Sequence, residues 1–268
     1  MTHLSSLSFV VIKLHEQPRS EILANWITTA PFSQLGFQAI DKRDTPKSEI
    51  DSLQGWQTKL IYGRNLTPGE VGAAQSHFDA YKVGLKSGTE WLLIMEDDCS
   101  PRSELTEFLN IISKIHVKEP ILINLNPGRV LRSKPKMNKI NQELSGLKQI
   151  YPIASFANLA NCYLLNRSAL EVVKGFPTSP IVATADFPPF ITSLNNWLAL
   201  PNSLATVDEN IESVIGDRKS IGMLVRFVRW VLRITSIQYF LCRSQYRSLG
   251  SFYRYEIQSR IDIFTSSN

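Results

Sequence analysis

The chain has 268 residues, of which 43% are hydrophobic and 20% are charged, and its net charge is +5. This composition is ordinary for a folded protein, and the length fits one α/β domain of about 200 residues with an appendage. The cysteines, Cys99, Cys162 and Cys242, are widely spaced and form no C-x-x-C pair. They argue against a disulfide framework and a structural zinc site, and they favour a reducing interior.

The positive charge is concentrated near the C-terminus. Residues 218–260 carry nine Lys or Arg residues against one acid, Glu256, a net charge of +8, which leaves −3 for the rest of the chain. At the N-terminus, the apolar run Phe9–Ile12 is too short for the core of a signal peptide or for a membrane span. We therefore expect a protein that is not exported, with a folded domain over residues 1–217 and a basic tail over residues 218–268.

The first 41 residues predict a strand, a helix and a second strand. Ser8–Leu14 is a β-rich apolar run, Ser20–Ala30 has a helical pattern, and Phe37–Asp41 is a short apolar run that ends in an acid. This order indicates a crossover unit, and therefore a largely parallel sheet with helices on its faces. Asp41 is then either a contact for the ribose of a nucleotide or a loop carboxylate in water.

A helix with a nearly bare face is predicted to begin at Thr67. Thr67 fits the N-cap position, Pro68 fits the first helical position, and Glu70 falls three residues after Thr67, as in a capping box. Glu70 and His77 are seven residues apart and project from nearly the same side, where a sugar or a phosphate would fit. The structural alternative assigns Glu70 to the capping box and makes His77 a hydrogen-bonded residue of the core.

The strongest chemical signal is an apolar strand that runs into three acids. Trp91–Met95 has no polar residue at alternate positions, which indicates a strand buried on both faces, and Glu96, Asp97 and Asp98 mark its carboxyl end. Adjacent carboxylates repel one another and need solvent, bases or a cation. Mg²⁺ or Mn²⁺ would satisfy them best, because these ions bind carboxylate oxygens and bridge to substrate phosphates. Alternatively, the acids form a solvated turn before a helix whose N-cap is Ser100.

Three later segments predict strands and carry two further candidates. Pro120–Asn126 reads as a buried strand, Ala157–Leu165 as a strand followed by a helix, and Ala199–Val207 as the last core strand. Tyr163 either lines a substrate pocket or packs in the core. Asp186 follows a small apolar run and is either a general base or a helix cap.

Residues 221–241 predict a basic amphipathic helix. Arg226, Arg229 and Arg233 are spaced by three and four and form a stripe on an otherwise apolar sequence. Three arginines argue against spanning the bilayer, whereas a helix that lies on an anionic membrane surface, through residues 221–260, fits them. The alternative is a helix docked on the folded domain. No recognition motif for nucleic acid accompanies the basic residues.

Two of these blocks together resemble glycosyltransferase family 25, the lipopolysaccharide and lipooligosaccharide sugar transferases. Leu66–Gly72 and Ser76–His77 are similar to the family's threonine-rich turn with Gly-Glu-x-Gly and Ser-His, and Leu92–Asp98 is similar to its hydrophobic strand ending Glu-Asp-Asp. The resemblance covers roughly residues 9–186. The family usually opens with paired arginines, whereas this chain has the single Arg19, so the contact of the N-terminal strand with a nucleotide is open.

The resemblance implies a GT-A-like, Rossmann-like α/β domain with a mostly parallel sheet that binds a nucleotide sugar. It implies transfer of a hexose, with galactose the first choice, from a UDP-sugar to a saccharide acceptor, with inversion and metal assistance. Mn²⁺ or Mg²⁺ is expected on Glu96 and Asp98, and the general base is expected to be Asp186 or, second, Glu70. The residues expected to contact substrate are His77, Tyr163, Asp41 and Asp97. The acceptor would be a lipid-linked oligosaccharide, and the protein would be cytoplasmic and peripheral on the inner face of the cytoplasmic membrane.

Two other functions fit the same residues. The altered N-terminal strand allows a saccharide- or membrane-binding protein that keeps the fold without turnover. The acids would also serve a metal-dependent phosphohydrolase. Release of UDP from UDP-sugars separates the transferase from the binding protein, whereas release of phosphate without any acceptor would mark the hydrolase.

Overall fold

The computed structural model describes residues 6–56, 58, 64–126, 151–152, 161–174, 181, 196–199, 203–208 and 211. The chain divides into two compact units, each considered by itself below. The first comprises residues 1–40, 76–175 and 194–212, and the second comprises residues 41–75, 176–193 and 213–268. Asp186 and the basic segment 221–260 lie outside the described residues.

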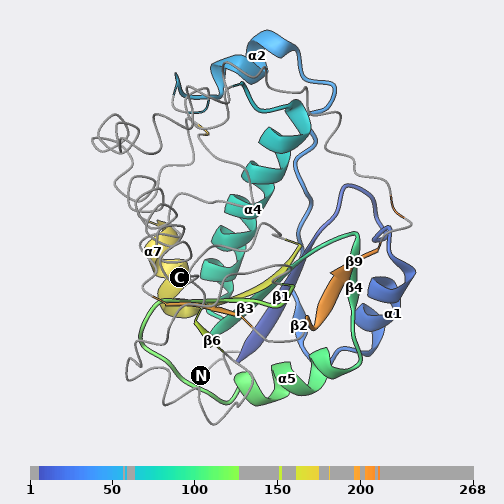
Figure 1. Cartoon of the computed structure of the whole chain (residues 1–268), viewed down its shortest axis with the longest axis vertical. Helices are drawn as coiled ribbons and strands as arrows, with labels where there is room; N and C mark the ends of the chain where they lie inside the picture. Colours follow the sequence, from blue (N-terminus) through green and yellow to red (C-terminus); the bar gives the residue numbers. More distant parts are fainter. Residues whose placement is uncertain are drawn as a thin grey trace, which may run out of the picture. The chain divides into compact units, whose positions relative to one another are not determined.

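A seven-stranded mixed sheet forms the centre of the first unit (Figure 1). In spatial order its strands are β2 (Ser33–Gln34), β1 (Leu7–Ile12), β3 (Trp91–Glu96), β7 (Cys162–Asn166), β5 (Ile121–Asn124), β8 (Asn196–Ala199) and β6 (Tyr151–Pro152). The neighbours β2 and β1, β1 and β3, and β5 and β8 are parallel, whereas β7 and β6 run against their neighbours. Five of these seven described strands therefore share one direction, which agrees with the α/β class and the mostly parallel sheet predicted from the sequence.

The first helix, α1 (Glu21–Thr29), begins where the sequence predicts it. The N-cap is Ser20, whose hydroxyl accepts a hydrogen bond from the Leu23 N–H at 3.4 Å. The second strand is displaced from its predicted position, because β2 ends at Gln34 and residues 37–41 form no strand. In that segment the Ile40 N–H donates to the Ser76 hydroxyl at 2.8 Å, so this main-chain donor is satisfied by a side chain and not by a neighbouring strand.

Cys99, Ser100 and Pro101 form a short strand, β4, instead of the predicted start of a helix. They pair antiparallel with β9 (Ala205–Val207) in a separate two-stranded sheet. Helix α5 (Glu104–Ile112) therefore begins later, with Ser103 at its N-cap position. The prediction that Ser100 caps a helix is wrong, as is the single last core strand over residues 199–207, because β8 joins the central sheet and β9 joins the small one.

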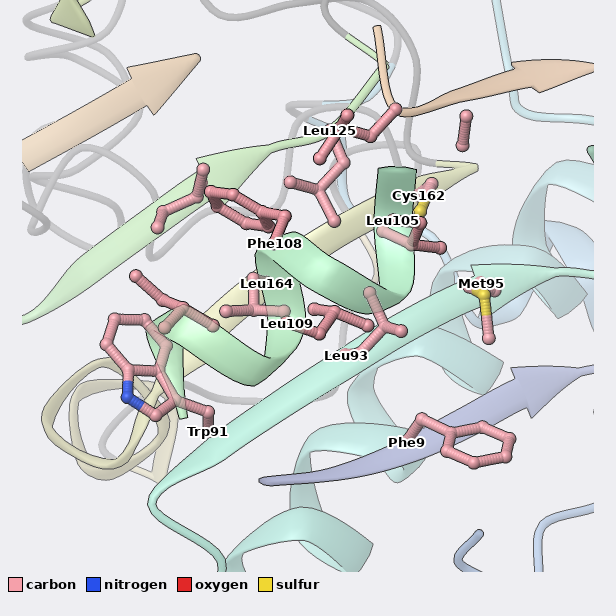
Figure 2. Close-up of a cluster of buried hydrophobic side chains, with 14 of the residues drawn as sticks. Phe9, Trp91, Leu93, Met95, Leu105, Phe108, Leu109, Leu125, Cys162 and Leu164 are labelled. Carbon is pink, nitrogen blue, oxygen red and sulfur yellow. The ribbon is translucent and has the colours of Figure 1, made fainter. Parts of the chain in front are cut away.

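The main hydrophobic core covers one face of the central sheet. Alternate residues of a strand share a face, and on β1 and β3 the odd-numbered residues point into this core (Figure 2). Helix α5 closes it with the residues of its apolar stripe, and Trp26 of α1 packs edge-on against Phe9 with ring centroids 5.2 Å apart. The labelled side chains in Figure 2 that form the centre of the core are Phe9, Trp91, Leu93, Met95, Leu105, Phe108, Leu109, Leu125, Cys162 and Leu164.

Helix α4 (Pro68–Ser87) packs its second half against the opposite face of the sheet, where the even-numbered residues of β3 point (Figure 1). The approach is close because Gly84 has no side chain. A Cβ atom added to Gly84 would lie 2.5 Å from Cδ2 and 3.2 Å from Cγ of Leu92 on β3. The main chain of the helix therefore rests directly on Leu92, which is fully buried.

The second unit contains helix α2 (Lys47–Ser52) and the first two turns of α4. Its described core consists of Ile50, Leu66, Val71, Ala74 and Ile181. A bridge between Gln54 and Ile181 joins distant parts of the chain within this unit. In the described part of the chain, no helix is both long and apolar enough to cross a membrane.

Candidate active site

Glu96, Asp97 and Asp98 lie at the carboxyl end of the central strand β3, as the sequence predicts. The acidic turn is held in place by main-chain hydrogen bonds to four neighbouring segments. These bonds run from Glu96 N–H to Asn161 O at 2.9 Å, Asp97 N–H to Ile12 O at 3.1 Å, Ser20 N–H to Asp97 O at 2.9 Å and Asp208 N–H to Asp98 O at 2.8 Å. The backbone under the carboxylates is therefore fixed, which favours a site whose geometry is formed in advance.

Arg19 neutralises the middle acid. Its Nε and Nη2 atoms donate to Oδ1 of Asp97 at 2.9 and 2.5 Å, and Nη2 also lies 3.3 Å from Oδ2 of Asp98. The side chains of Arg19 and Asp97 are 19% and 8% exposed. Asp97, predicted as a substrate contact, is thus placed in a largely buried ion pair. Arg19 supplies one positive charge against the three carboxylates of this acidic turn.

Asp98 lies in an environment that disfavours its ionised form. Its Oδ1 atom is buried and accepts no hydrogen bond from the described residues. Burial, together with the neighbouring Glu96, raises the pKa of Asp98 to about 6, although Arg19 works in the opposite direction. A buried carboxylate oxygen without a donor is the kind of atom that a bound cation satisfies.

The donor set is chemically suited to a hard divalent cation but is incomplete by itself. Glu96 and Asp98 offer oxygen ligands, and the Oδ1 atom of Asp98 has no competing partner in the described chain. Within these same ranges, no group of three His, Cys, Asp or Glu side chains is arranged to hold a metal. Two carboxylates with substrate phosphates and waters are, however, the usual ligands of Mg²⁺ in phosphate-binding sites.

His77 and Tyr163 meet next to this acidic turn, on the face of the sheet that α4 covers. The Nε2 atom of His77 lies 3.1 Å from Oε1 of Glu96, and its Nδ1 atom lies 2.6 Å from the Tyr163 hydroxyl. The Tyr163 hydroxyl in turn lies 2.6 Å from that of Tyr81. His77 and Tyr163 are both buried, so the structure places them as hydrogen-bonded core residues that reach the site through Glu96.

Glu70 lies in the second unit and makes the contacts of a helix cap. Its N–H donates to the Thr67 hydroxyl at 3.2 Å, and its Oε2 accepts from the Thr67 N–H at 2.9 Å, which is the reciprocal capping box. Arg64 donates to both carboxylate oxygens, at 2.7 and 2.8 Å, and Glu70 is only 2% exposed. These contacts hold the carboxylate in one place at the start of the helix.

Asp41 lies in the second unit as well, on the surface. Arg43, two residues away, donates from Nε to its two carboxylate oxygens at 2.9 and 3.0 Å. Both side chains are 40% exposed. The structure therefore gives Asp41 a local surface partner, and its predicted contact with a ribose stays a prediction.

Sequence reasoning missed two residues next to the acids. Arg19 was noted only as a departure from a motif, although its guanidinium lies on the acidic turn. Asn161 was not singled out at all. Its carbonyl accepts from the Glu96 N–H, its Oδ1 accepts from Nδ2 of Asn126 at 3.0 Å, and its buried Nδ2 has no acceptor among the described residues. The sequence does contain a signal for this polar cluster, because asparagines occur at the ends of two apolar strands, at Asn124, Asn126 and Asn161.

The chain matches the model of a known sequence family. The sequence model of glycosyltransferase family 25, described as an LPS biosynthesis protein, matches residues 7–173, and this range contains Arg19, the acidic turn, His77 and Tyr163. The match covers more than half of the chain, so the chain belongs to glycosyltransferase family 25. Asp186 lies beyond the matched range. No curated protein matches the chain.

Family membership supports glycosyltransferase activity in lipopolysaccharide biosynthesis. Such an enzyme acts on two partners, a sugar donor and an acceptor. The resemblance of the two sequence blocks is thereby confirmed at the level of the family.

Proposed function

We propose that the protein transfers a hexose, with galactose the first choice, from a UDP-sugar to a saccharide acceptor of lipopolysaccharide, with inversion and with a divalent cation bound at the acidic turn. The observation that carries this proposal is the buried Oδ1 atom of Asp98 beside Glu96, at the carboxyl end of β3, which has no hydrogen-bond partner among the residues that the structure describes. Ligands of open α/β sheets bind at carboxyl strand ends, and a diphosphate requires positive charge there.

In this proposal, Glu96 and Asp98 hold Mn²⁺ or Mg²⁺, which offsets the negative charge of the departing nucleotide. Arg19 keeps Asp97 paired, so the repulsion within the acidic turn is lowered before any ligand binds. Within the described part of the chain, the amide Nδ2 of Asn161 has no acceptor, so it is available to an oxygen of the sugar or the diphosphate.

An acceptor hydroxyl must lose its proton as it attacks the anomeric carbon. A carboxylate within hydrogen-bond reach is the usual base. Asp186 remains our first candidate and Glu70 the second. The double hydrogen bond from Arg64 supports a structural role for Glu70, because the guanidinium occupies both of its carboxylate oxygens.

Release of UDP from a panel of UDP-sugars, with and without Mn²⁺, tests the activity. We expect one UDP-hexose to be turned over fastest, release to require a saccharide acceptor, and a chelator to lower the rate by about 100-fold, since a bound metal contributes several kcal/mol to such steps. Absence of UDP release for every donor, in a protein that still unfolds cooperatively, would contradict transfer and favour a binding protein. Release at the same rate with a chelator present would contradict the role of the cation.

We further propose that the acceptor is lipid-linked and that residues 221–260 bring the protein to an anionic membrane surface. The support is the arginine stripe at Arg226, Arg229 and Arg233 within the segment of net charge +8. The full chain is expected to sediment with anionic liposomes but not with neutral ones, and a chain that ends before Ser220 is expected to stay in the supernatant with either. Equal sedimentation of the two chains would contradict a membrane role for the tail.

A further inference from the structure

Four side chains form a continuous hydrogen-bonded chain that ends at the acidic turn. It runs from the Tyr81 hydroxyl to the Tyr163 hydroxyl at 2.6 Å, from there to Nδ1 of His77 at 2.6 Å, and from Nε2 of His77 to Oε1 of Glu96 at 3.1 Å. Tyr81, Tyr163 and His77 are each at most 3% exposed, whereas the Glu96 side chain is 27% exposed. This series of hydrogen bonds therefore connects three buried side chains to the partly exposed Glu96 of the proposed site.

The periodicities of helix and strand bring these residues together. His77 and Tyr81 are four residues apart on α4 and so lie on one face of that helix. Tyr163 on β7 is paired with Ile94 on β3, and Glu96 is two residues further along β3, so both project from the same face of the sheet. That face is the one on which α4 rests through Gly84.

The chemistry of the groups fixes the direction of the protons. The Glu96 carboxylate can only accept, so Nε2 of His77 must carry the proton that joins them. In a neutral imidazole the other nitrogen, Nδ1, is then an acceptor, and the Tyr163 O–H must donate to it. The Tyr163 oxygen is left to accept from the Tyr81 O–H. Burial raises the pKa of Tyr81, so the proton that begins the chain is retained.

We propose that Tyr81, Tyr163 and His77 are positioning residues that fix His77 as its Nε2–H tautomer and thereby hold the Glu96 carboxylate in one orientation at the carboxyl end of β3. Every link has one donor and one acceptor, all in the same direction. The reverse tautomer would place a ring N–H against Tyr163 and leave Nε2 of His77 and the Glu96 carboxylate as two acceptors 3.1 Å apart. The contribution of this chain to cation binding rests on the proposed function, whereas the tautomer does not.

The tautomer is measured directly from the imidazole ¹⁵N shifts and two-bond ¹H–¹⁵N couplings of ¹⁵N-histidine-labelled protein at neutral pH. The sequence has four histidines, so the signal of His77 is assigned from its loss in His77→Gln. Wild type is expected to show the Nε2–H tautomer. Tyr163→Phe removes the donor to Nδ1 and is expected to give a mixture of tautomers. Tyr81→Phe leaves that donor in place and is expected to change the shifts less.

Mn²⁺ affinity supplies the second measurement. Loss of an outer partner of a metal ligand typically weakens binding by about 10–100-fold, and we expect a loss in this range for Tyr163→Phe and a smaller one for Tyr81→Phe. The double variant is expected to match Tyr163→Phe alone, because both changes interrupt one chain. Thr89→Val is the matched control. It removes a buried hydroxyl that donates to Trp91 O at 2.9 Å at the opposite end of β3, and it should leave Mn²⁺ affinity unchanged.

The two measurements separate the possible failures. An Nδ1–H tautomer in wild-type protein overturns the proposed chain, whatever the protein binds, and this result needs no variant to fold. Mn²⁺ affinities that are equal in Tyr163→Phe and Thr89→Val overturn the link between the chain and Glu96 as a ligand. If wild type shows the Nε2–H tautomer but binds no Mn²⁺, the metal-assisted mechanism fails while the fixed tautomer stands.

Discussion

Replacing Asp98 with asparagine is expected to make the protein more stable and much less active. The pKa of Asp98 is raised from 3.8 to about 6, chiefly by burial. Because the folded-state pKa lies above the unfolded one, the ionised carboxylate destabilises the fold at neutral pH, by at most about 3 kcal/mol. Asparagine has nearly the same shape without the charge. In the presence of a chelator, we therefore expect Asp98→Asn to raise the free energy of unfolding at pH 7.5 by about 1–3 kcal/mol.

This gain in stability is expected to depend on pH. Wild type loses stability as the pH rises from about 4 to about 6, the window between the two pKa values, so the difference between wild type and Asp98→Asn should vanish below about pH 4. Urea unfolding at both pH values measures it. A variant that is less stable than wild type at pH 7.5 would show that the ionised Asp98 carboxylate stabilises the fold.

The same substitution removes a proposed metal ligand, so UDP release is expected to fall by about 100-fold or more. Asp79→Asn is the matched control. Asp79 lies on the exposed side of α4, 43% exposed, and is paired with Lys82 at 2.7 Å. It should leave the rate and the stability close to those of wild type. Equal rates for Asp98→Asn and wild type would remove Asp98 from the proposed site.

Arg19→Ala is expected to have the largest effect on stability. The guanidinium of Arg19 contacts the acidic turn, and its removal takes this partner away from the largely buried Asp97 carboxylate. Breaking one side of a buried ion pair typically costs about 3–5 kcal/mol, and we expect about 3 kcal/mol here because the guanidinium is 19% exposed. Arg19→Lys should recover only part of this loss, since an ammonium group lacks the planar fork that contacts both acids.

Arg43→Ala is the control for that experiment, because it breaks another Arg–Asp pair, which lies on the surface. The side chains of Arg43 and Asp41 are both 40% exposed, and such pairs contribute about 0–1 kcal/mol. Urea unfolding of both variants at neutral pH compares them. If Arg19→Ala and Arg43→Ala lower the free energy of unfolding by similar amounts, burial does not make the Arg19–Asp97 pair more stabilising than a surface pair.

Local sequence signals predicted the elements that depend mainly on local interactions. The helical pattern that begins at Ser20 and the capping residue Thr67 correctly marked the starts of α1 and α4, and the apolar run Trp91–Met95 correctly marked the central strand. Elements whose limits depend on distant partners were misjudged. Cys99–Pro101 became a strand because residues 205–207, about a hundred positions later, pair with it, and no local pattern contains that information.

The candidate site shows the same division. The acids at the end of β3 could be predicted because hydrophobic and acidic residues are adjacent in the sequence. Their partners could not, since Arg19 is 78 residues from Asp97 and His77 is 86 residues from Tyr163. The antiparallel direction of β7, which brings Tyr163 opposite Ile94, also has no signature in its own apolar run.

Gly84 also affects the position of His77, which lies on the same face of α4. At Gly84 only the side chain of Leu92 lies between α4 and β3, so helix and strand approach closely at this point. His77 lies two turns before Gly84 on that face, and Glu96 lies four residues after Leu92 on the strand. The close approach at Gly84 therefore helps to set the distance between helix and strand at His77, about ten ångströms further along the helix axis, where the imidazole meets the Glu96 carboxylate.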